Sequence, residues 1–169
     1  MANPSRSSKR AILAWLALLG CAISAWLGAY QLGVAALPPD PFFDGTAAVL
    51  HSRVSAALPV PDAVLGAVAY AVELALTVLG GADRYRTRPW LVIAYGATAV
   101  SMALTSALLV VLQATVEHAW CTLCLASAAL SFLIVGPAIA EAAAAVRFVA
   151  REVRHGRPIA AALRGPSPA

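Results

Sequence analysis

Four long apolar segments alternate with shorter polar ones along the chain. At about 1.5 Å of helix rise per residue, roughly 20 apolar residues cross a bilayer core of about 30 Å. Each segment comes close to that length or exceeds it, and the second carries one charge, at Glu73. The segments cover about residues 11–36, 63–81, 90–114 and 119–140. The pattern predicts an all-α integral membrane protein, built as a bundle of four transmembrane helices.

Small residues recur at four-residue spacing on the first and third of these segments. Small side chains let two membrane helices approach closely, so both sets are expected to lie where helices pack. The two sets are Gly20, Ser24 and Gly28, and Ala97, Ser101 and Thr105.

The longest polar stretch, residues 37–62, separates the first two segments. A turn signal at Asp40-Pro41 precedes Thr46, which we expect to cap a short helix. Leu50 and Val54 would share the apolar face of that helix. Such a helix would lie on the membrane surface as a lid.

Basic residues interrupt the apolar pattern beyond Glu141. Arg147, Arg151 and Arg154 are too closely spaced to cross a bilayer, and apolar residues share the other face of the same helix. Residues 142–169 are therefore predicted to form a basic amphipathic surface helix followed by a disordered tail. The four-span domain itself would cover residues 11–141.

Composition agrees with a membrane protein. Apolar residues make up 61% of the chain and charged residues 12%, whereas soluble domains are about half apolar and about a quarter charged. The net charge is +4, but the basic residues cluster beside the apolar segments. That distribution indicates contact with a lipid bilayer and no binding of nucleic acid.

The distribution of Lys and Arg predicts the orientation of the bundle. Of the twelve, three precede the first segment, three lie between the second and third, and five follow the fourth. In a four-span bundle these fall on one side, and only Arg53 falls on the other. The positive-inside rule then puts both termini, including residues 1–10, in the cytoplasm. Residues 37–62 and the start of the last segment would face outward, where disulfides form and persist.

The sequence Trp120-Cys121-Thr122-Leu123-Cys124 stands at this outer end of the last segment. Cysteines at i and i+3 share a helix face, so their sulfurs can close a disulfide across one turn. The positive end of the helix dipole also favours the thiolate form. Cys121 should lie near water and Cys124 about 5 Å deeper. The pair would suit electron transfer from aqueous thiols to a lipid-soluble acceptor. The alternative is two cysteines packed as small apolar residues.

Other side chains are candidates for chemistry. Glu117 and His118 precede the cysteines closely enough to accept protons. Glu73 is an intramembrane carboxyl group, and such groups often have a function. Its alternative role is a protonated side chain hydrogen-bonded to serines or threonines of the third segment. Cys21, about 15 Å in from the opposite end of the first segment, is expected only to pack.

Taken together, these features resemble the vitamin K epoxide reductase family, most closely its bacterial single-domain branch. The resemblance covers roughly residues 11–141. Members are four-helix membrane oxidoreductases that couple a quinone or vitamin K to thiol–disulfide exchange. Besides the four spans, it rests on His51-Ser52, on Pro61-Asp62-Ala63-Val64-Leu65-Gly66 followed by Tyr70, and on Trp120-Cys121-Thr122-Leu123-Cys124.

The resemblance implies an enzyme of the bacterial cytoplasmic membrane that reduces a quinone, menaquinone or ubiquinone, with electrons from extracytoplasmic thiols. Cys121 would exchange with the donor and Cys124 would face the quinone. Ser52 resembles the family's loop serine near the quinone. Asp62 stands where many members have an asparagine that hydrogen-bonds a quinone carbonyl. No metal is expected.

The chain departs from the family pattern in two places. Many relatives carry a second cysteine pair in the first loop, which shuttles electrons from a thioredoxin-like partner, whereas residues 37–62 contain no cysteine. A tyrosine that some members have one turn beyond the second cysteine is replaced by Ala128. The expected donor is therefore a thioredoxin-like protein or a small thiol that acts directly on Cys121.

Two other functions fit the sequence. Cys121, Cys124, His51 and His118 could supply a Cys2His2 metal site on the outer face, although the two histidines lie on separate loops. The chain could also be a non-catalytic protein that binds a quinone without turning it over. Stoichiometric zinc would identify the first function, and quinone binding without thiol-dependent reduction would identify the second.

Overall fold

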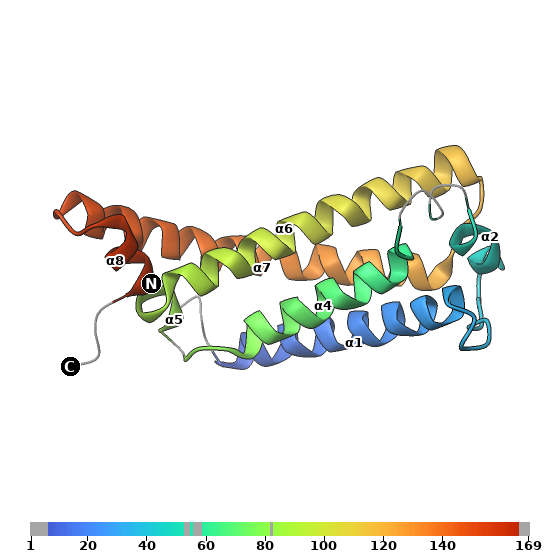
Figure 1. Ribbon diagram of the computed structural model, residues 1–169, viewed down its shortest axis with the longest axis horizontal. Helices are drawn as coiled ribbons and strands as arrows, with labels where there is room; N and C mark the ends of the chain where they lie inside the picture. The colour runs from blue at the N-terminus through green and yellow to red at the C-terminus, as the bar shows by residue number, and fades with distance from the viewer. Residues whose placement is uncertain (1–6, 53–54, 56–58, 82, 166–169) are drawn as a thin grey trace.

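The structure is a computed structural model that describes residues 7–52, 55, 59–81 and 83–165 (Figure 1). Every element in this part of the chain is helical, which confirms the predicted all-α class. The long helices are α1 (Ser7–Gln31), α4 (Asp62–Val78), α6 (Pro89–Leu112) and α7 (Thr122–Arg154). The short ones are α2 (Thr46–Leu50), α5 (Arg84–Thr87), the π-helical turn η1 (Gln113–Glu117) and α8 (Ile159–Arg164).

The long helices lie side by side as two closely packed pairs. α1 packs along α4 and α6 packs along α7, while α4 and α6 touch each other much less (Figure 1). Among the described residues, three helices are long and apolar enough to cross a membrane: Arg10–Gln31, Pro89–Glu117 and Thr122–Arg154. The chain is therefore a multi-pass membrane protein. At 17 residues, α4 is shorter and lies in the same bundle, and its role as a fourth span stays a prediction.

The small-residue stripe on α1 lies at the contact between α1 and α4, as predicted. A Cβ atom on Gly20 would stand 2.4 Å from the ring of Tyr70, and one on Gly28 would stand 2.8 Å from the side chain of Val64. Any larger residue would push these two helices apart.

The stripe on α6 does not form a packing face. Ala97, Ser101 and Thr105 are exposed on the side of the bundle. The close contact between α6 and α7 is made instead at Gly96, where a Cβ atom would stand 2.4 Å from that of Ala142. The hydroxyl side chains of Ser101 and Thr105 line a cavity instead.

The lid helix is shorter than expected. It comprises only Thr46–Leu50, and Gly45 is the residue at its N-cap. Thr46 is thus the first helical residue and not the cap, because its hydroxyl donates to the Asp40 carboxylate at 2.6 Å. Val54, which was expected on the same helix face, lies outside the described residues, as does Arg53.

The C-terminal part also differs from expectation. α7 continues without a break from Thr122 to Arg154, so the basic segment extends the last long helix and does not form a separate surface helix. The helix breaks at residues 155–158, but α8 follows this break at Ile159–Arg164. A disordered tail directly after the break is therefore wrong for these residues. The alanine-rich run at 159–164 favours a helix.

A buried ion pair joins the helices at the end of the bundle opposite α2. The guanidinium group of Arg84 is fully buried and donates two hydrogen bonds of 2.7 Å to the carboxylate of Glu141 on α7. It also donates to the carbonyl oxygens of Leu76, Thr77 and Leu79 at the end of α4. Arg84 therefore ties α4 to α7.

Glu73 is fully buried on α4, and neither of its carboxyl oxygens has a hydrogen-bond partner among the described residues. The hydroxyl of Thr77 bonds the backbone carbonyl oxygen of Glu73 instead. The expected hydrogen bonds to serines or threonines of the third segment are therefore wrong. The hydroxyl groups of α6 point elsewhere, Ser101 and Thr98 to carbonyl oxygens of their own helix.

Candidate functional site

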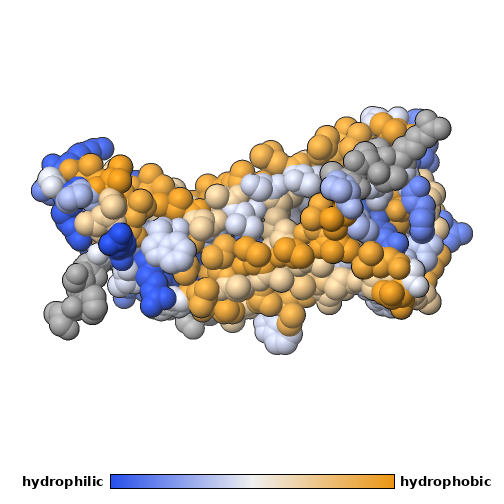
Figure 2. Space-filling model, viewed as in Figure 1, coloured by the Kyte–Doolittle hydropathy of each residue, from blue (hydrophilic) through white to orange (hydrophobic). Residues whose placement is uncertain are grey.

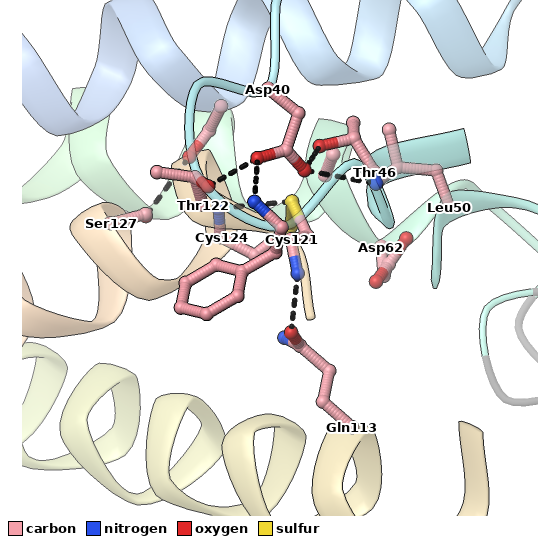
Figure 3. The surroundings of a disulfide bond; sticks show 12 residues. Asp40, Thr46, Leu50, Asp62, Gln113, Cys121, Thr122, Cys124 and Ser127 are labelled. Atoms are coloured by element: carbon pink, nitrogen blue, oxygen red, sulfur yellow. Dashed lines mark hydrogen bonds between the residues drawn. A yellow bond between two sulfur atoms is a disulfide. The ribbon is translucent and has the colours of Figure 1, made fainter. Parts of the chain in front are cut away.

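Cys121 and Cys124 form a disulfide at the start of α7, with Cα atoms 5.2 Å apart (Figure 3). Cys121 is the N-cap residue, and its Sγ accepts a hydrogen bond of 3.1 Å from the N–H of Cys124. The N–H of Cys121 donates to the side-chain oxygen of Gln113 in η1, also at 3.1 Å. The predicted cysteine pair is thus confirmed as a disulfide, and η1 and the first turn of α7 fix its position.

The two cysteines differ in their exposure. Cys124 is half-buried and lines a large cavity within the bundle. Cys121 is 0% exposed. The expectation that Cys121 lies open to water is therefore wrong for this conformation; Asp40, Thr46 and Leu50 are among the residues that surround the disulfide (Figure 3).

The cavity has a volume of about 410 Å³ and lies between the two helix pairs. Leu65 of α4 and Ser101 and Thr105 of α6 line it and are also exposed on the side of the bundle. The cavity therefore opens sideways, toward the position of lipid. In Figure 2, paler residues lie in the hollow between the apolar edges of α6 and α4. A concave, mainly apolar site with a few polar groups is typical of a small-molecule pocket.

Ser52 and Asp62, the two residues singled out by the family resemblance, both line this cavity. The Oδ1 atom of Asp62 accepts hydrogen bonds from the hydroxyl of Ser55 at 2.7 Å and from the side-chain N–H of Gln31 at 2.6 Å. Ser52 accepts the backbone N–H of Ser55 at 3.2 Å. Gln31 and Ser55 were missed in the sequence because no motif contains them.

A cluster of hydroxyl groups lines the deeper part of the cavity. The hydroxyl of Tyr70 donates to the carbonyl oxygen of Ser127 at 2.5 Å and lies 2.8 Å from the hydroxyl of Ser131. Ser106 donates to Ser131 at 3.2 Å, and the hydroxyl oxygens of Ser24 and Ser127 lie 3.5 Å apart. The members come from α1, α4, α6 and α7. Only the tertiary structure brings them together, so the sequence could not identify the cluster.

Glu117 and His118, the candidate proton-transfer groups, have different surroundings. Glu117 lines the cavity, and its Oε1 atom is buried with no hydrogen-bond partner among the described residues. His118 is exposed and has a left-handed backbone with φ of 48°. Of the two, Glu117 is the one beside the cavity.

Asp40, which the sequence marked only as a turn residue, connects the first loop to α7 (Figure 3). Its carboxylate accepts hydrogen bonds from the hydroxyls of Thr46 and Thr122 and from the backbone N–H groups of Thr46, Phe43 and Thr122. Burial raises the pKa of Asp40, but the hydrogen bonds from Thr122 and Thr46 outweigh burial and hold this pKa well below its ordinary value. Asp40 is therefore ionised beside the disulfide.

The residues of the alternative metal site do not converge. Within the part of the chain that the structure describes, no three His, Cys, Asp or Glu side chains form a group that could hold a metal ion. His51 packs edge-on against Tyr30, with ring centroids 5.3 Å apart. Cys21 is half-buried, and its thiol lies 3.6 Å from the carbonyl oxygen of Ala67, as expected for a packing residue.

The fold and the site are those of a multi-pass membrane helix bundle with a disulfide beside an internal, laterally open cavity. The comparison with protein families is more specific. The model of the vitamin K epoxide reductase family matches residues 11–139, most of the chain, and the chain therefore belongs to this family. Its members are membrane oxidoreductases that use quinones as substrates and exchange thiols and disulfides. No curated protein and no solved structure matches the chain.

Proposed function

We propose that this protein passes electrons from thiols outside the cytoplasm, through the Cys121–Cys124 pair, to a quinone in the membrane. One observation carries the proposal. The disulfide extends from Cys121, beneath the loop at the end of the bundle, to Cys124, which lines the laterally open cavity. A single redox group thus adjoins both a surface loop and a site accessible from lipid.

The reaction balances in three steps. A donor thiolate attacks the sulfur of Cys121, the disulfide breaks, and Cys124 leaves as a thiolate. A second donor thiolate, from the same protein or from a second molecule of a small thiol, attacks the donor sulfur of this mixed disulfide, which forms the donor disulfide and releases Cys121 as a thiolate. The two thiolates then give two electrons to the quinone, which takes up two protons and becomes the quinol. The Cys121–Cys124 bond forms again in this last step.

The polar groups of the cavity suggest how a quinone would be held. A quinone carbonyl oxygen only accepts hydrogen bonds, and an ionised carboxylate cannot donate one. We therefore assign the hydroxyl of Ser52 to the carbonyl oxygen. Asp62 would accept the hydroxyl of the quinol that forms on reduction. Glu117 is the candidate for proton transfer, because its Oε1 atom is buried at the cavity without a hydrogen-bond partner among the described residues.

The thiol donor would act on Cys121 directly. The loop contains no cysteine that could relay electrons. Either a thioredoxin-like protein or a small thiol satisfies the chemistry. A Cys124→Ser variant should accumulate a disulfide adduct on Cys121, since the resolving thiol is absent. Peptide mapping of this variant from oxidising cells would show it, and an adduct on Cys21 alone would contradict direct donation.

The orientation is proposed from the distribution of basic residues, as part of a four-span bundle in a bacterial cytoplasmic membrane. The N-terminal end of α1 and helix α8 lie at one end of the bundle, and α2 lies at the other (Figure 1). A reporter fused after Ala169 should be cytoplasmic. One inserted at Gly33, where the surroundings are open, should be outside. A C-terminal reporter that is active only outside the cell would refute the four-span orientation.

Quinone reduction by purified cysteine variants tests the central proposal. Cys124→Ser and Cys121→Ser should each abolish thiol-dependent quinone reduction, and Cys21→Ala should retain it. If both single variants of the pair keep the parent's activity, the disulfide is structural. Quinone binding without reduction by the parent protein would identify a non-catalytic quinone-binding protein, and stoichiometric zinc would identify a metal-binding one.

A further inference from the structure

The loop before α2 is fastened to α7 by one carboxylate. Asp40 accepts the hydroxyl of Thr46 at 2.6 Å and its N–H at 3.1 Å, which fixes the loop's own conformation. It also accepts the hydroxyl of Thr122, the first residue of α7 and 82 positions away in sequence. Hydrogen bonds to charged groups are stronger than neutral ones. Asp40 is therefore the polar connection between this loop and the helix that carries the disulfide.

The fastened loop covers Cys121. Gly45 packs so closely on the backbone of Trp120 that a Cβ atom would stand 2.4 Å from its carbonyl oxygen. The rings of Phe43 and Trp120 are neighbours, with centroids 6.4 Å apart. Cys121 is 0% exposed, and Thr46 and Leu50 of α2 lie beside it (Figure 3). Thiol–disulfide exchange requires a donor sulfur to reach the attacked sulfur, so exchange at Cys121 requires this loop to separate from α7.

The carboxylate of Asp40 also affects how readily Cys121 becomes a thiolate. In the first turn of α7 the N–H of Cys124 donates to the Cys121 sulfur, an arrangement that would stabilise a thiolate there. Asp40 puts a negative charge in that same turn, and like charges disfavour each other. Other titratable groups around the pair are Asp44 and His51 on the loop and α2, Asp62 on α4, Glu117 on η1, and His118. Among them, Asp40 is the group hydrogen-bonded to α7.

We propose that Asp40 is a positioning residue that controls the reactivity of Cys121 in two ways. It fastens the loop over the sulfur, and it opposes formation of the thiolate while the loop is closed. Separation of the loop would uncover the sulfur and remove the opposing charge in one movement. The inference rests on the proposed function, in which Cys121 is the residue that exchanges with the donor.

Alkylation of Cys121 as a function of pH separates the two effects. The full chain with Cys21→Ala and Cys124→Ser leaves Cys121 as its one thiol, and iodoacetamide is a small neutral probe. Asp40→Asn keeps a hydrogen-bond acceptor but loses the charge. It should shift the pH midpoint of alkylation down by about half to one unit. The rate below the midpoint should also rise about two- to fivefold, because an amide accepts weaker hydrogen bonds than a carboxylate and the loop therefore separates more often.

Substitutions of Thr122 test whether its hydrogen bond to Asp40 holds the loop closed. Thr122→Val has nearly the same shape but no hydroxyl, and it should accelerate alkylation about tenfold at every pH, because a hydrogen bond to a charged group opposes loop opening. Thr122→Ser retains the hydroxyl and should stay within about twofold of the parent by the same reasoning. Asp44→Asn is the matched control, since Asp44 is an exposed carboxylate on the same loop. It should change neither the rate nor the midpoint.

Two results would overturn the inference. One is an Asp40→Asn profile that coincides with the parent and with Asp44→Asn. The other is equal acceleration by Thr122→Val and Thr122→Ser. The thermal midpoint of each variant shows whether it is folded, and the Thr122 pair decides the outcome if Asp40→Asn is not. Failure of the proposed function is seen separately, as absent thiol-dependent quinone reduction by the chain with all its cysteines.

Discussion

Glu141→Gln should destabilise the bundle by about 3 kcal/mol. The change removes the charge that balances Arg84, whose side chain is 0% exposed. Breaking a buried ion pair by removing one partner costs roughly 3–5 kcal/mol. The lower end of that range applies because Arg84 keeps the hydrogen bonds that it donates to carbonyl oxygens of α4, among them that of Thr77. Glutamine also still accepts one hydrogen bond.

Unfolding of the purified protein in detergent, induced by heat or SDS and followed by circular dichroism, measures this loss. Glu152→Gln is the matched control. Glu152 lies on the same helix and pairs with Arg157 at the same 2.7 Å, but the two side chains are 28% and 35% exposed. A pair exposed in this way contributes about 0–1 kcal/mol. The two variants should therefore differ by about 2 kcal/mol or more.

Equal losses in the two variants would refute this reasoning. They would mean that water reaches Arg84 and that the end of the bundle opposite α2 is not closed. Quinone reduction by folded Glu141→Gln should be near that of the parent, because Glu141 follows Cys124 by 17 residues on α7, about 25 Å along the helix.

Three further predictions concern single side chains. Tyr70→Phe, which removes a hydroxyl from the cavity, should raise the KM for quinone about two- to tenfold in steady-state assays. Gly20→Ala should lower the thermal midpoint because its methyl group meets the Tyr70 ring, whereas Gly136→Ala, in open surroundings, should not. Because the pKa of Asp40 is lowered in the folded state, its stabilising effect is present above an unfolded-state pKa of about 3.9 and is lost in stronger acid. The difference in stability between the parent and Asp40→Asn should therefore be constant near neutral pH and disappear on acidification.

Local patterns predicted the membrane helices and the cysteine pair. Length and hydropathy suffice for a transmembrane helix, since lipid forces the backbone to satisfy its own hydrogen bonds. The pairing of Cys121 with Cys124 was also predicted correctly, although Cys121 is the N-cap residue of α7 and lies just outside the helix. The prediction that the small residues of α1 form a packing face was correct, because Gly20 leaves room for the Tyr70 ring of α4.

The errors came from residues whose roles depend on distant parts of the chain. Ser101 and Thr105 have the spacing of a packing face, but they line a cavity, since α4 and α6 touch each other little. Thr46 has the chemistry of a cap, but Asp40 accepts its hydroxyl. Cys121 was expected to be exposed because nothing in the sequence indicates that Asp40 binds Thr122, 82 residues away.

The lateral opening of the cavity determines how substrate concentration must be measured. A quinone that enters between α4 and α6 comes from the lipid, so its mole fraction in the membrane, and not its amount per volume of buffer, sets the occupancy of the site. Adding lipid or detergent at constant total quinone dilutes the substrate without changing its molarity. An apparent KM has meaning for this protein only together with the amount of the hydrophobic phase in which it was measured.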